Sequence, residues 1–399
     1  MGWLGLDDTD TLTQGCTTFS LHELISHLPP HITVGQVRLV RLWPFAQQRT
    51  RGNAAVAVEL TTDDEVELLQ FLDSYWEEHL APLVGQKEPS TQQKRQQSPT
   101  DPGMVWFSNP CQDPEYYHAA VSRQVKLKEV PSATKSWGGL GQIGATAAVL
   151  WPQTRHTWEA IAWREEHRWP STERDVCQAA IAEVADAEDL FLTRDPRSKR
   201  SLISPRGTCP VLFGLRATSQ EAAHRAAQHL LDAKATEEVI AMRVFITNQA
   251  TDDHLDGSLQ VLVSGVKILG RGTTIIETEQ TKLFAFAESG PVKLLAQSLK
   301  KGDRIEVKGL APESGVVHIE KMRVTGRASS KHRPMCTTCN KRMKSMGQAQ
   351  GVRCPVCKKR QDDAWTVTPA DQSSGPWVQP PMDSRRHLAR PIEWEIEPQ

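Results

Sequence analysis

The chain has 399 residues, which is enough for two to four domains with separate hydrophobic cores. Its 47 lysines and arginines nearly balance its 48 aspartates and glutamates, so bulk charge does not indicate nucleic-acid binding and any basic surface must be local. No apolar run is long enough to cross a membrane, and Asp7 and Asp8 interrupt the N-terminus before a signal-peptide core could form, so we expect a cytoplasmic protein.

The first half of the chain alternates strand and helix patterns. A short apolar run, a helical pattern, two strands rich in Val and Leu, and a capped helical pattern follow one another over residues 1–6, 16–28, 34–43, 54–60 and 61–83. A glycine-rich turn then runs into a helix of small residues, and a further helix and strand follow, so residues 136–247 are predicted to form a second α+β unit.

Residues 258–326 change to five β-type runs at short spacing, with one helical pattern between the third and fourth. Five strands with a helix before the fourth are typical of an OB-fold, which commonly binds single-stranded or looped nucleic acid. Another small β-barrel or sandwich is the alternative.

Two C-x₂-C pairs, Cys336 with Cys339 and Cys354 with Cys357, predict a tetrahedral zinc ion held by four thiolates. A closed four-thiolate shell indicates a structural role. Eight cysteines without a disulfide pattern also fit a reducing cytoplasm. The ribbon carries seven cations, which favour contact with phosphates, although a solvated charged face is the alternative. They are Lys341, Arg342, Lys344, Arg353, Lys358, Lys359 and Arg360.

Three carboxylates, Asp7, Asp8 and Asp10, stand at the end of the first strand. Carboxylates this close repel one another unless a cation holds them, and Mg²⁺ binds one or two carboxylates together with substrate phosphates. An acidic turn that caps a helix is the alternative. No P-loop or kinase glycine loop occurs in the sequence, so an ordinary P-loop site is excluded.

Other segments could complete a nucleotide site. Arg51 could neutralise phosphate charge, Asn53 could donate hydrogen bonds, and the turn that contains Gly139 and Gly141 could expose backbone N–H groups at a helix start. Each signal is weak alone, because surface arginines and packing glycines are common. The polar stretch 245–255 is either a ligand site or a hydrophilic linker capped by Asx turns.

Four collinear stretches together carry a family resemblance: "GLDDTDTLTQGCTT", "TRGNAAV", "FITNQATDDHL", and the paired C-x₂-C motifs with "RRHLARP" behind them. Over its full length the chain resembles the archaeal 2-agmatinylcytidine synthetases, also called agmatidine synthetases. The resemblance implies a multidomain α+β fold. Its parts are a kinase-like α/β domain (1–130), a ferredoxin-like α+β domain (131–256), an OB-fold (257–328), a zinc ribbon (331–362) and a tail (363–399).

The resemblance implies an ATP- and Mg²⁺-dependent ligase that acts on the minor isoleucine tRNA with a CAU anticodon. Such an enzyme phosphorylates the C2 carbonyl oxygen of the wobble cytidine, agmatine displaces the phosphate, and the product decodes AUA. A non-catalytic OB-fold and zinc-ribbon protein that binds nucleic acid, with a nucleotide-sensing N-terminal domain, is the alternative. Such a protein would be expected to have lost some of five residues, and all of them are present: Asp7, Asp8, Asp10, Arg51 and Asn53.

The resemblance also assigns residues. Asp7, Asp8 and Asp10 would hold Mg²⁺ against the triphosphate, and Thr17 matches a threonine that carries phosphate in the family. Arg51 and Asn53 would lie beside the nucleotide. The segment around Gly139 is less basic than in the family, which weakens its phosphate role. The agmatine and cytosine side is implied for Asn248, Thr251, Asp252 and His254. Asp252 is the expected partner of the agmatine guanidinium.

Overall fold

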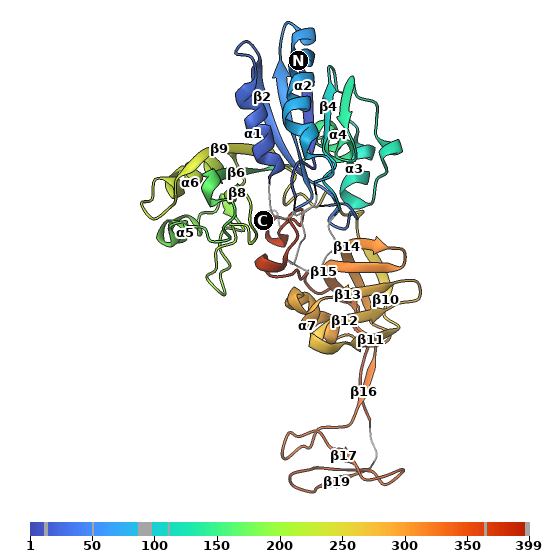
Figure 1. Ribbon diagram of the computed structural model, residues 1–399. Helices are drawn as coiled ribbons and strands as arrows, with labels where there is room; N and C mark the ends of the chain where they lie inside the picture. Colours follow the sequence, from blue (N-terminus) through green and yellow to red (C-terminus); the bar gives the residue numbers. More distant parts are fainter. Residues whose placement is uncertain (12–14, 50–51, 87–97, 111, 363–364, 396–399) are drawn as a thin grey trace. The chain divides into compact units, whose positions relative to one another are not determined.

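The computed structural model describes the chain except for residues 12–14, 50–51, 87–97, 111, 363–364 and 396–399 (Figure 1). The chain divides into two compact units. The first comprises residues 1–256 together with 382–399, and the second comprises residues 257–381. Residues 382–395, expected to form part of a separate tail, thus belong to the N-terminal unit. Among the described residues, no helix is long and apolar enough to span a membrane.

The first half of the N-terminal unit is a β-α-β-β-α-β arrangement with strand order β4-β1-β3-β2, all neighbours being antiparallel. The predicted cap of the second helix is confirmed, since the Asp64 carboxylate accepts a hydrogen bond from the Glu67 N–H at 2.9 Å. The elements are β1 (Gly2–Asp7), α1 (Thr17–His27), β2 (Thr33–Arg41), β3 (Ala54–Thr61), α2 (Glu65–Tyr75) and β4 (Gly103–Phe107). A π-helical turn (Trp76–Leu80) and a 3₁₀ turn (Ala81–Leu83) extend α2.

The second half repeats this arrangement. Its strand order is β9-β6-β8-β7, again antiparallel throughout. The elements are β6 (Thr157–Arg164), α5 (Gln178–Val184), β7 (Leu190–Phe191), β8 (Val211–Ala217), α6 (Gln220–Leu231) and β9 (Val239–Thr247). The edge strands β2 and β9 pair in parallel, Arg38 opposite Ile246 and Leu39 opposite Thr247, so both halves share one nine-stranded sheet.

The segment between the halves packs with the first half, although the sequence placed residues 136–151 in the second. It contains α3 (Pro114–Ser122), β5 (Lys135–Gly138) and α4 (Gln142–Leu150). β5 extends the sheet next to β4, and α4 packs against β1, β3 and β4. The helix can lie this close because its residues are small, and a Cβ at Gly144 would overlap the Asp7 carboxylate.

The second unit contains a six-stranded sheet in the order β10-β14-β15-β13-β12-β11. The strands β10 and β11 are separated by only two residues, so both edges of the sheet come from one segment of chain. The elements are β10 (Leu259–Leu262), β11 (Gly265–Ile268), β12 (Thr274–Glu277), β13 (Lys282–Ala285), α7 (Pro291–Gln297), β14 (Arg304–Glu313) and β15 (Val316–Gly326). The expected helix before the fourth strand pattern is α7, which contacts β11, β12, β13 and β15.

The cysteine-rich part begins and ends in a two-stranded ladder. Here β16 (Ser330–His332) pairs with β20 (Thr366–Thr368). Between them β17 (Lys344–Ser345), β18 (Val352–Arg353) and β19 (Arg360–Gln361) form a small antiparallel sheet. The only buried cluster described in this part is made of Cys336, Met343, Val352 and Cys354, so its core is very small.

Candidate active site

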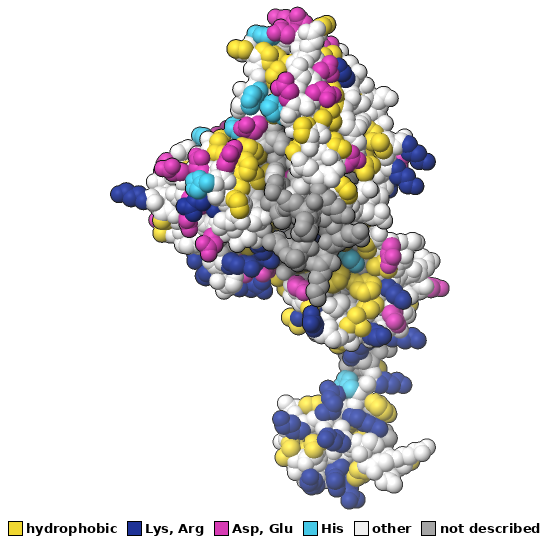
Figure 2. All heavy atoms as spheres, viewed as in Figure 1, with side chains coloured by type: hydrophobic (Ala, Val, Ile, Leu, Met, Phe, Trp, Pro, Cys, Tyr) yellow, Lys and Arg dark blue, Asp and Glu magenta, His cyan; other side chains and the backbone are white. Residues whose placement is uncertain are grey.

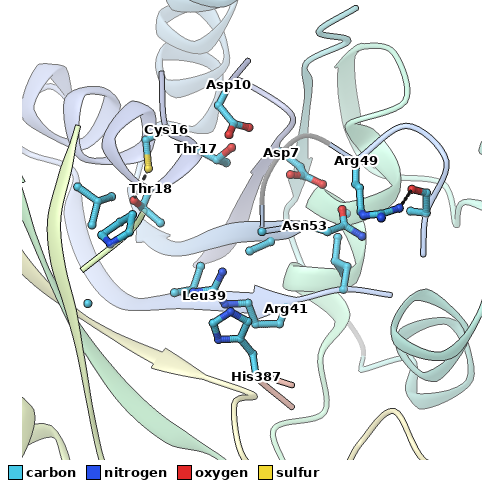
Figure 3. A pocket seen from close by; sticks show the side chains of 18 of the residues that line it. Asp7, Asp10, Cys16, Thr17, Thr18, Leu39, Arg41, Arg49, Asn53 and His387 are labelled. Atoms are coloured by element: carbon cyan, nitrogen blue, oxygen red, sulfur yellow. Dashed lines mark hydrogen bonds between the residues drawn. The ribbon is translucent and has the colours of Figure 1, made fainter. Parts of the chain in front are cut away.

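A cavity of about 860 Å³ lies within the N-terminal unit (Figure 3). Its walls come from the end of β1, the start of α1, the end of β2, the turn before α4, and the strands β6 and β8. Residues 202–209 and residues of the C-terminal segment 382–387 complete the lining. The cavity therefore collects residues from both halves of the shared sheet and from the end of the chain.

The three carboxylates predicted as one group do meet in this cavity, since Asp7, Asp8 and Asp10 all line it. Asp7 is the last residue of β1, and its Oδ1 accepts a hydrogen bond from the Asp8 N–H at 2.7 Å. Asp8 has a left-handed backbone (φ 57°), and its Oδ2 accepts a hydrogen bond from the Asp101 N–H at 2.9 Å.

Burial and mutual repulsion make Asp7 and Asp8 poor acids in the absence of a cation. Burial raises the pKa of Asp7 to about 7, and the charge of Asp10 adds to the effect. The pKa of Asp8 is raised to about 8, first by burial and then by the charges of Asp7, Asp10 and Asp101. A divalent cation would restore the ionised forms, so the donor set fits a hard, oxygen-binding metal such as Mg²⁺.

Thr17 is the first residue of α1, beside the acidic group, and it also lines the cavity. The hydroxyl of Thr9 donates hydrogen bonds to Thr17 Oγ1 at 3.4 Å and to Ser20 Oγ at 2.9 Å, which fixes the acidic loop against the helix. The first turn of α1 carries no acidic side chain, so its N-terminus is a favourable position for phosphate oxygens.

Asn53 lines the cavity between β2 and β3. Its backbone is left-handed (φ 43°), its carbonyl accepts a hydrogen bond from Leu42 at 2.8 Å, and its Nδ2 donates to the Trp43 carbonyl at 2.5 Å. Arg51 lies outside the described residues, so its predicted contact with the nucleotide stays a prediction. Arg49 and Arg123 are among the other cations that line the cavity, and neither was singled out in the sequence.

The two predicted glycines differ in position. Gly141 lines the cavity at the start of α4, and a Cβ there would crowd the carbonyl of Asp7. Gly139 is not among the described lining residues. Its N–H donates to the Pro102 carbonyl at 2.9 Å, and a Cβ there would overlap the carboxylate of Asp101. Both positions require glycine because neighbouring atoms lie where a Cβ would be. A nucleotide contact for either glycine stays a prediction.

The stretch predicted to bind agmatine and cytosine is mostly buried, with Asp252 half-buried, and it is bound to its own chain. Asn248 accepts a hydrogen bond from the Arg41 N–H at 2.8 Å and donates to the Arg41 carbonyl at 2.9 Å. The Asp252 carboxylate accepts one from the Arg390 N–H at 2.7 Å. Thr251 and His254 are buried as well. None of these four is among the described residues that line the cavity. Their contacts position Arg41 and the C-terminal segment, and substrate contact stays a prediction.

Sequence reasoning missed a polar network at the opposite wall. The Glu159 carboxylate pairs with Arg41 at 3.3 Å and with Arg216 at 3.5 Å. Gln249 Nε2 donates to Glu159 Oε2 at 2.5 Å, and Gln249 Oε1 lies 3.1 Å from His387 Nδ1. Glu159 and Arg216 are opposite each other in the β6–β8 pairing. The available signals were single charges inside apolar strands, "TWEAIAW" and "VLFGLRA", and the "RRHLARP" motif.

The second unit holds the predicted zinc site. The Sγ atoms of Cys336, Cys339, Cys354 and Cys357 all lie within 4.8 Å of one another, as one tetrahedral ion requires. The two C-x₂-C turns have the same geometry: the N–H of the first cysteine donates to a carbonyl five residues on, at 2.9 Å in both. Each turn ends on a left-handed residue, Asn340 or Lys358. Backbone N–H groups lower the pKa of the Cys336 thiol to about 6, which favours the ligating thiolate.

Comparison with known proteins covers the whole chain. Family models described as the TiaS TCKD domain, the TiaS FLD domain and the TiaS C-terminal zinc ribbon domain match residues 3–140, 139–254 and 333–368. The 2-agmatinylcytidine synthetase TiaS of Methanopyrus kandleri, named for an isoleucine tRNA, is 30% identical, covering 100% of this chain and 98% of that protein. The enzyme of the same name from Methanosarcina acetivorans is 31% identical over 98% of this chain and 97% of its own length.

Solved structures of TiaS also match this chain over nearly its full length. A crystal structure of apo TiaS, described as an agmatidine synthetase of an isoleucine tRNA, matches with a TM-score of 0.77 at 26% identity, over 98% of this chain and 97% of that one. A crystal structure of TiaS in complex with an isoleucine tRNA and ATP matches with a TM-score of 0.76 at 25% identity, over 100% and 98%. Three domain models in collinear order and relatives aligned from end to end confirm the resemblance drawn from the motifs: this chain belongs to the TiaS family.

Proposed function

We propose that this chain is an ATP-dependent ligase that converts the wobble cytidine of an isoleucine tRNA with a CAU anticodon into 2-agmatinylcytidine, so that the tRNA decodes AUA. The observation that carries the proposal is the meeting of Asp7, Asp8, Asp10 and Thr17 in one cavity of a chain that matches such enzymes over its full length. The non-catalytic alternative is not favoured, because a nucleotide sensor would not require this intact acidic group.

The reaction replaces the C2 carbonyl oxygen of cytosine with a nitrogen of agmatine. A carbonyl oxygen is a poor leaving group, so it must first accept a phosphoryl group from ATP. The primary amine of agmatine then attacks C2 and phosphate departs. Because water would regenerate cytidine at this stage, an enclosed site is needed. The cavity is large enough for more than one reactant and is walled by parts of both halves of the unit.

Asp7, Asp8 and Asp10 would hold Mg²⁺, which supplies positive charge to the triphosphate when it is bound. Thr17 and the N-terminus of α1 would contact phosphate oxygens, and Asn53 would lie beside the nucleotide. Arg51, Gly139 and Gly141 are further candidates for the nucleotide side. Asn248, Thr251, Asp252 and His254 would shape the agmatine and cytosine side through Arg41 and the C-terminal segment, which they hold in place.

Strand orders support finer assignments within the fold. The order β9-β6-β8-β7 in a β-α-β-β-α-β segment is typical of a ferredoxin-like domain and supports that assignment for the second half. The first half, which we propose is the kinase-like domain, has the same topology. In the second unit, three features support the proposed OB-fold: the order β10-β14-β15-β13-β12-β11, the parallel β13–β15 pair and the position of α7 before β14.

We propose that the second unit contacts the tRNA. The seven cations of the ribbon are all exposed, and Figure 2 shows Lys and Arg side chains gathered over the ribbon, the part labelled β17 and β19 in Figure 1. Such a surface suits phosphates of a folded RNA. Zinc would have a structural role there, and an enzyme of tRNA modification is expected in the cytoplasm.

The test is a reaction of the full chain with an unmodified CAU-anticodon tRNA transcript, ATP, Mg²⁺ and agmatine. Nucleosides from the digested tRNA are then analysed by mass spectrometry. We expect 2-agmatinylcytidine at the wobble position only, and only when both ATP and agmatine are present. A transcript whose wobble cytidine is replaced by uridine is the control. Failure to form the nucleoside with intact, zinc-loaded protein would refute the proposal.

A further inference from the structure

The polar network at the far wall of the cavity fixes the orientation of Gln249. This side chain is fully buried, and its Nε2 faces Glu159 Oε2 at 2.5 Å. Glu159 is held between the guanidinium groups of Arg41 and Arg216, so it is a carboxylate that can only accept hydrogen bonds. The amide nitrogen of Gln249 must therefore point at Glu159, and its Oε1 must point the other way.

That oxygen accepts from two donors. Arg216 Nε lies 3.0 Å from Gln249 Oε1 and donates to it. His387 Nδ1 lies 3.1 Å from the same oxygen. An amide oxygen cannot donate, so the imidazole must carry its proton on Nδ1. The chain Glu159–Gln249–His387 thus selects one tautomer, in which Nε2 has a free lone pair.

The charge state agrees with this assignment. Burial lowers the pKa of His387 well below its ordinary value, and the neighbouring cations Arg41 and Arg216 lower it further. The groups facing the ring are those two arginines, with Glu159 beyond them and paired to both. At neutral pH the ring is therefore an uncharged base.

His387 is also presented to the cavity. Many protein atoms lie near His387, but its surface is still accessible. It lines the same cavity as Asp7, Thr17 and Asn53 (Figure 3). Its backbone is fixed, since its carbonyl accepts from the Ala250 N–H at 2.9 Å, and that of Leu388 accepts from Asp252 at 2.8 Å. With Nδ1 bonded to Gln249, the exposed side of the ring presents Nε2.

We propose that His387 Nε2 accepts a proton from the protonated primary amine of bound agmatine and so frees the lone pair that attacks C2 of the activated cytidine. This inference rests on the proposed function. The ammonium of agmatine loses one proton to Nε2, the new bond joins the amine nitrogen to C2, the C2–O bond breaks with its electron pair leaving on the phosphate, and the second N–H proton leaves with that phosphate. Agmatine needs such a base because its primary amine has a pKa of about 10, like that of lysine, and is protonated at neutral pH.

The other titratable groups of the cavity are less suited to this step. Asp7, Asp8 and Asp10 belong to the proposed metal and phosphate end, and Glu159 is neutralised by its two arginines. Among the described lining residues, His387 is the only histidine. The acidic group would thus serve phosphoryl transfer, and the histidine on the returning tail would serve amine attack.

The test uses the full chain with His387→Asn. Asparagine Nδ2 can replace Nδ1 as the donor to Gln249, so the network stays intact while the base at Nε2 is lost. We expect the single-turnover rate of 2-agmatinylcytidine formation to fall on the order of a hundredfold or more, while tRNA-dependent ATP cleavage and the KM for agmatine change little. The defect should shrink as pH rises, and it should be small with a primary amine of pKa near 7, which is already neutral.

His387→Gln, which places an amide near Nε2, should show the same defect, and its melting temperature shows whether the fold is intact. His118→Asn, a half-exposed histidine outside the cavity lining, is the matched control and should react normally. Product formation by His387→Asn at the wild-type rate and with the wild-type pH profile would overturn the proposal. Absence of product with wild-type protein would instead refute the proposed function.

Discussion

The acidic group at the end of β1 leads to a prediction about stability as well as catalysis, and Asp8→Asn is the sharpest test. Asparagine tolerates the left-handed backbone of this position (φ 57°), and its Oδ1 can still accept the hydrogen bond from the Asp101 N–H. The substitution therefore removes one charge and little else. Because the carboxylates repel one another when no cation is bound, losing one should make the metal-free protein more stable.

The direction in which stability changes with pH follows from the pKa shifts of Asp7 and Asp8. The pKa values of Asp7 and Asp8 are raised to about 7 and about 8, so the folded state binds their protons more tightly than the unfolded state does. The stability that these protons contribute is fully present below about pH 4 and is lost as pH rises through about 7 to 8. Mg²⁺ should restore stability at high pH, because it favours the ionised carboxylates.

The same pKa values bound the stability that Asp8→Asn adds. Raising the pKa of Asp8 from 3.8 to about 8 corresponds to about 6 kcal/mol, at about 1.4 kcal/mol per pKa unit. Asp7 and Asp8 share part of this repulsion and Asp8 is partly exposed, so we expect Asp8→Asn to add about 2 kcal/mol to the free energy of unfolding at pH 8.5 in EDTA. Single-turnover ATP cleavage should at the same time slow about a hundredfold or more.

The assay is urea denaturation of wild type and variant at pH 5, 7 and 8.5, with EDTA or with Mg²⁺. Every tryptophan except Trp365 and Trp377 belongs to the N-terminal unit, so tryptophan fluorescence reports mainly on that unit. Asp73→Asn is the matched control. Hydrogen bonds from Lys135 and Trp137 lower the pKa of Asp73, so this variant should be less stable than wild type. An Asp8→Asn variant that is less stable than wild type in EDTA at pH 8.5, or equally stabilised by Mg²⁺, would refute the reasoning.

Three further predictions concern other parts of the chain. Cys336→Ser should lower bound zinc below one ion per chain and expose the ribbon to protease, because the ribbon has almost no core of its own. The N-terminal unit should still melt normally, and metal analysis with limited proteolysis checks the prediction. Arg38→Met should lower the free energy of unfolding by about 2 to 4 kcal/mol in urea denaturation, because the buried guanidinium lies over Trp3 and donates to carbonyls at the end of α4, including Val149 at 2.8 Å. Gly144→Ala should destabilise the unit by about 1 to 3 kcal/mol and abolish most ATP cleavage, because its methyl group would displace the Asp7 carboxylate; unchanged turnover and melting would contradict this close packing.

What the sequence predicted, and what it did not, follows from how local each signal was. Spacing within one turn was enough for Cys336 and Cys339, and Asp7 and Asp8 directly follow a recognisable strand. The α4 segment, predicted to be part of the second α+β unit, packs on β1 because its residues are small, a contact that chain order does not reveal. The contacts of Gln249 with Glu159 and His387 join positions 90 and 138 residues apart, which no local pattern reveals.

The path of the chain also explains why these distant contacts matter. The second unit lies between residues 256 and 382 in the sequence, and the chain then returns to the first unit. The returning segment supplies His387 to the cavity wall, and the polar stretch after β9 anchors it through Asp252. A chain truncated after the ribbon would thus lose a wall of the candidate active site together with the tail. An internal deletion of the ribbon, between His332 and Thr366, where β16 and β20 pair, would remove the proposed RNA contacts without this loss.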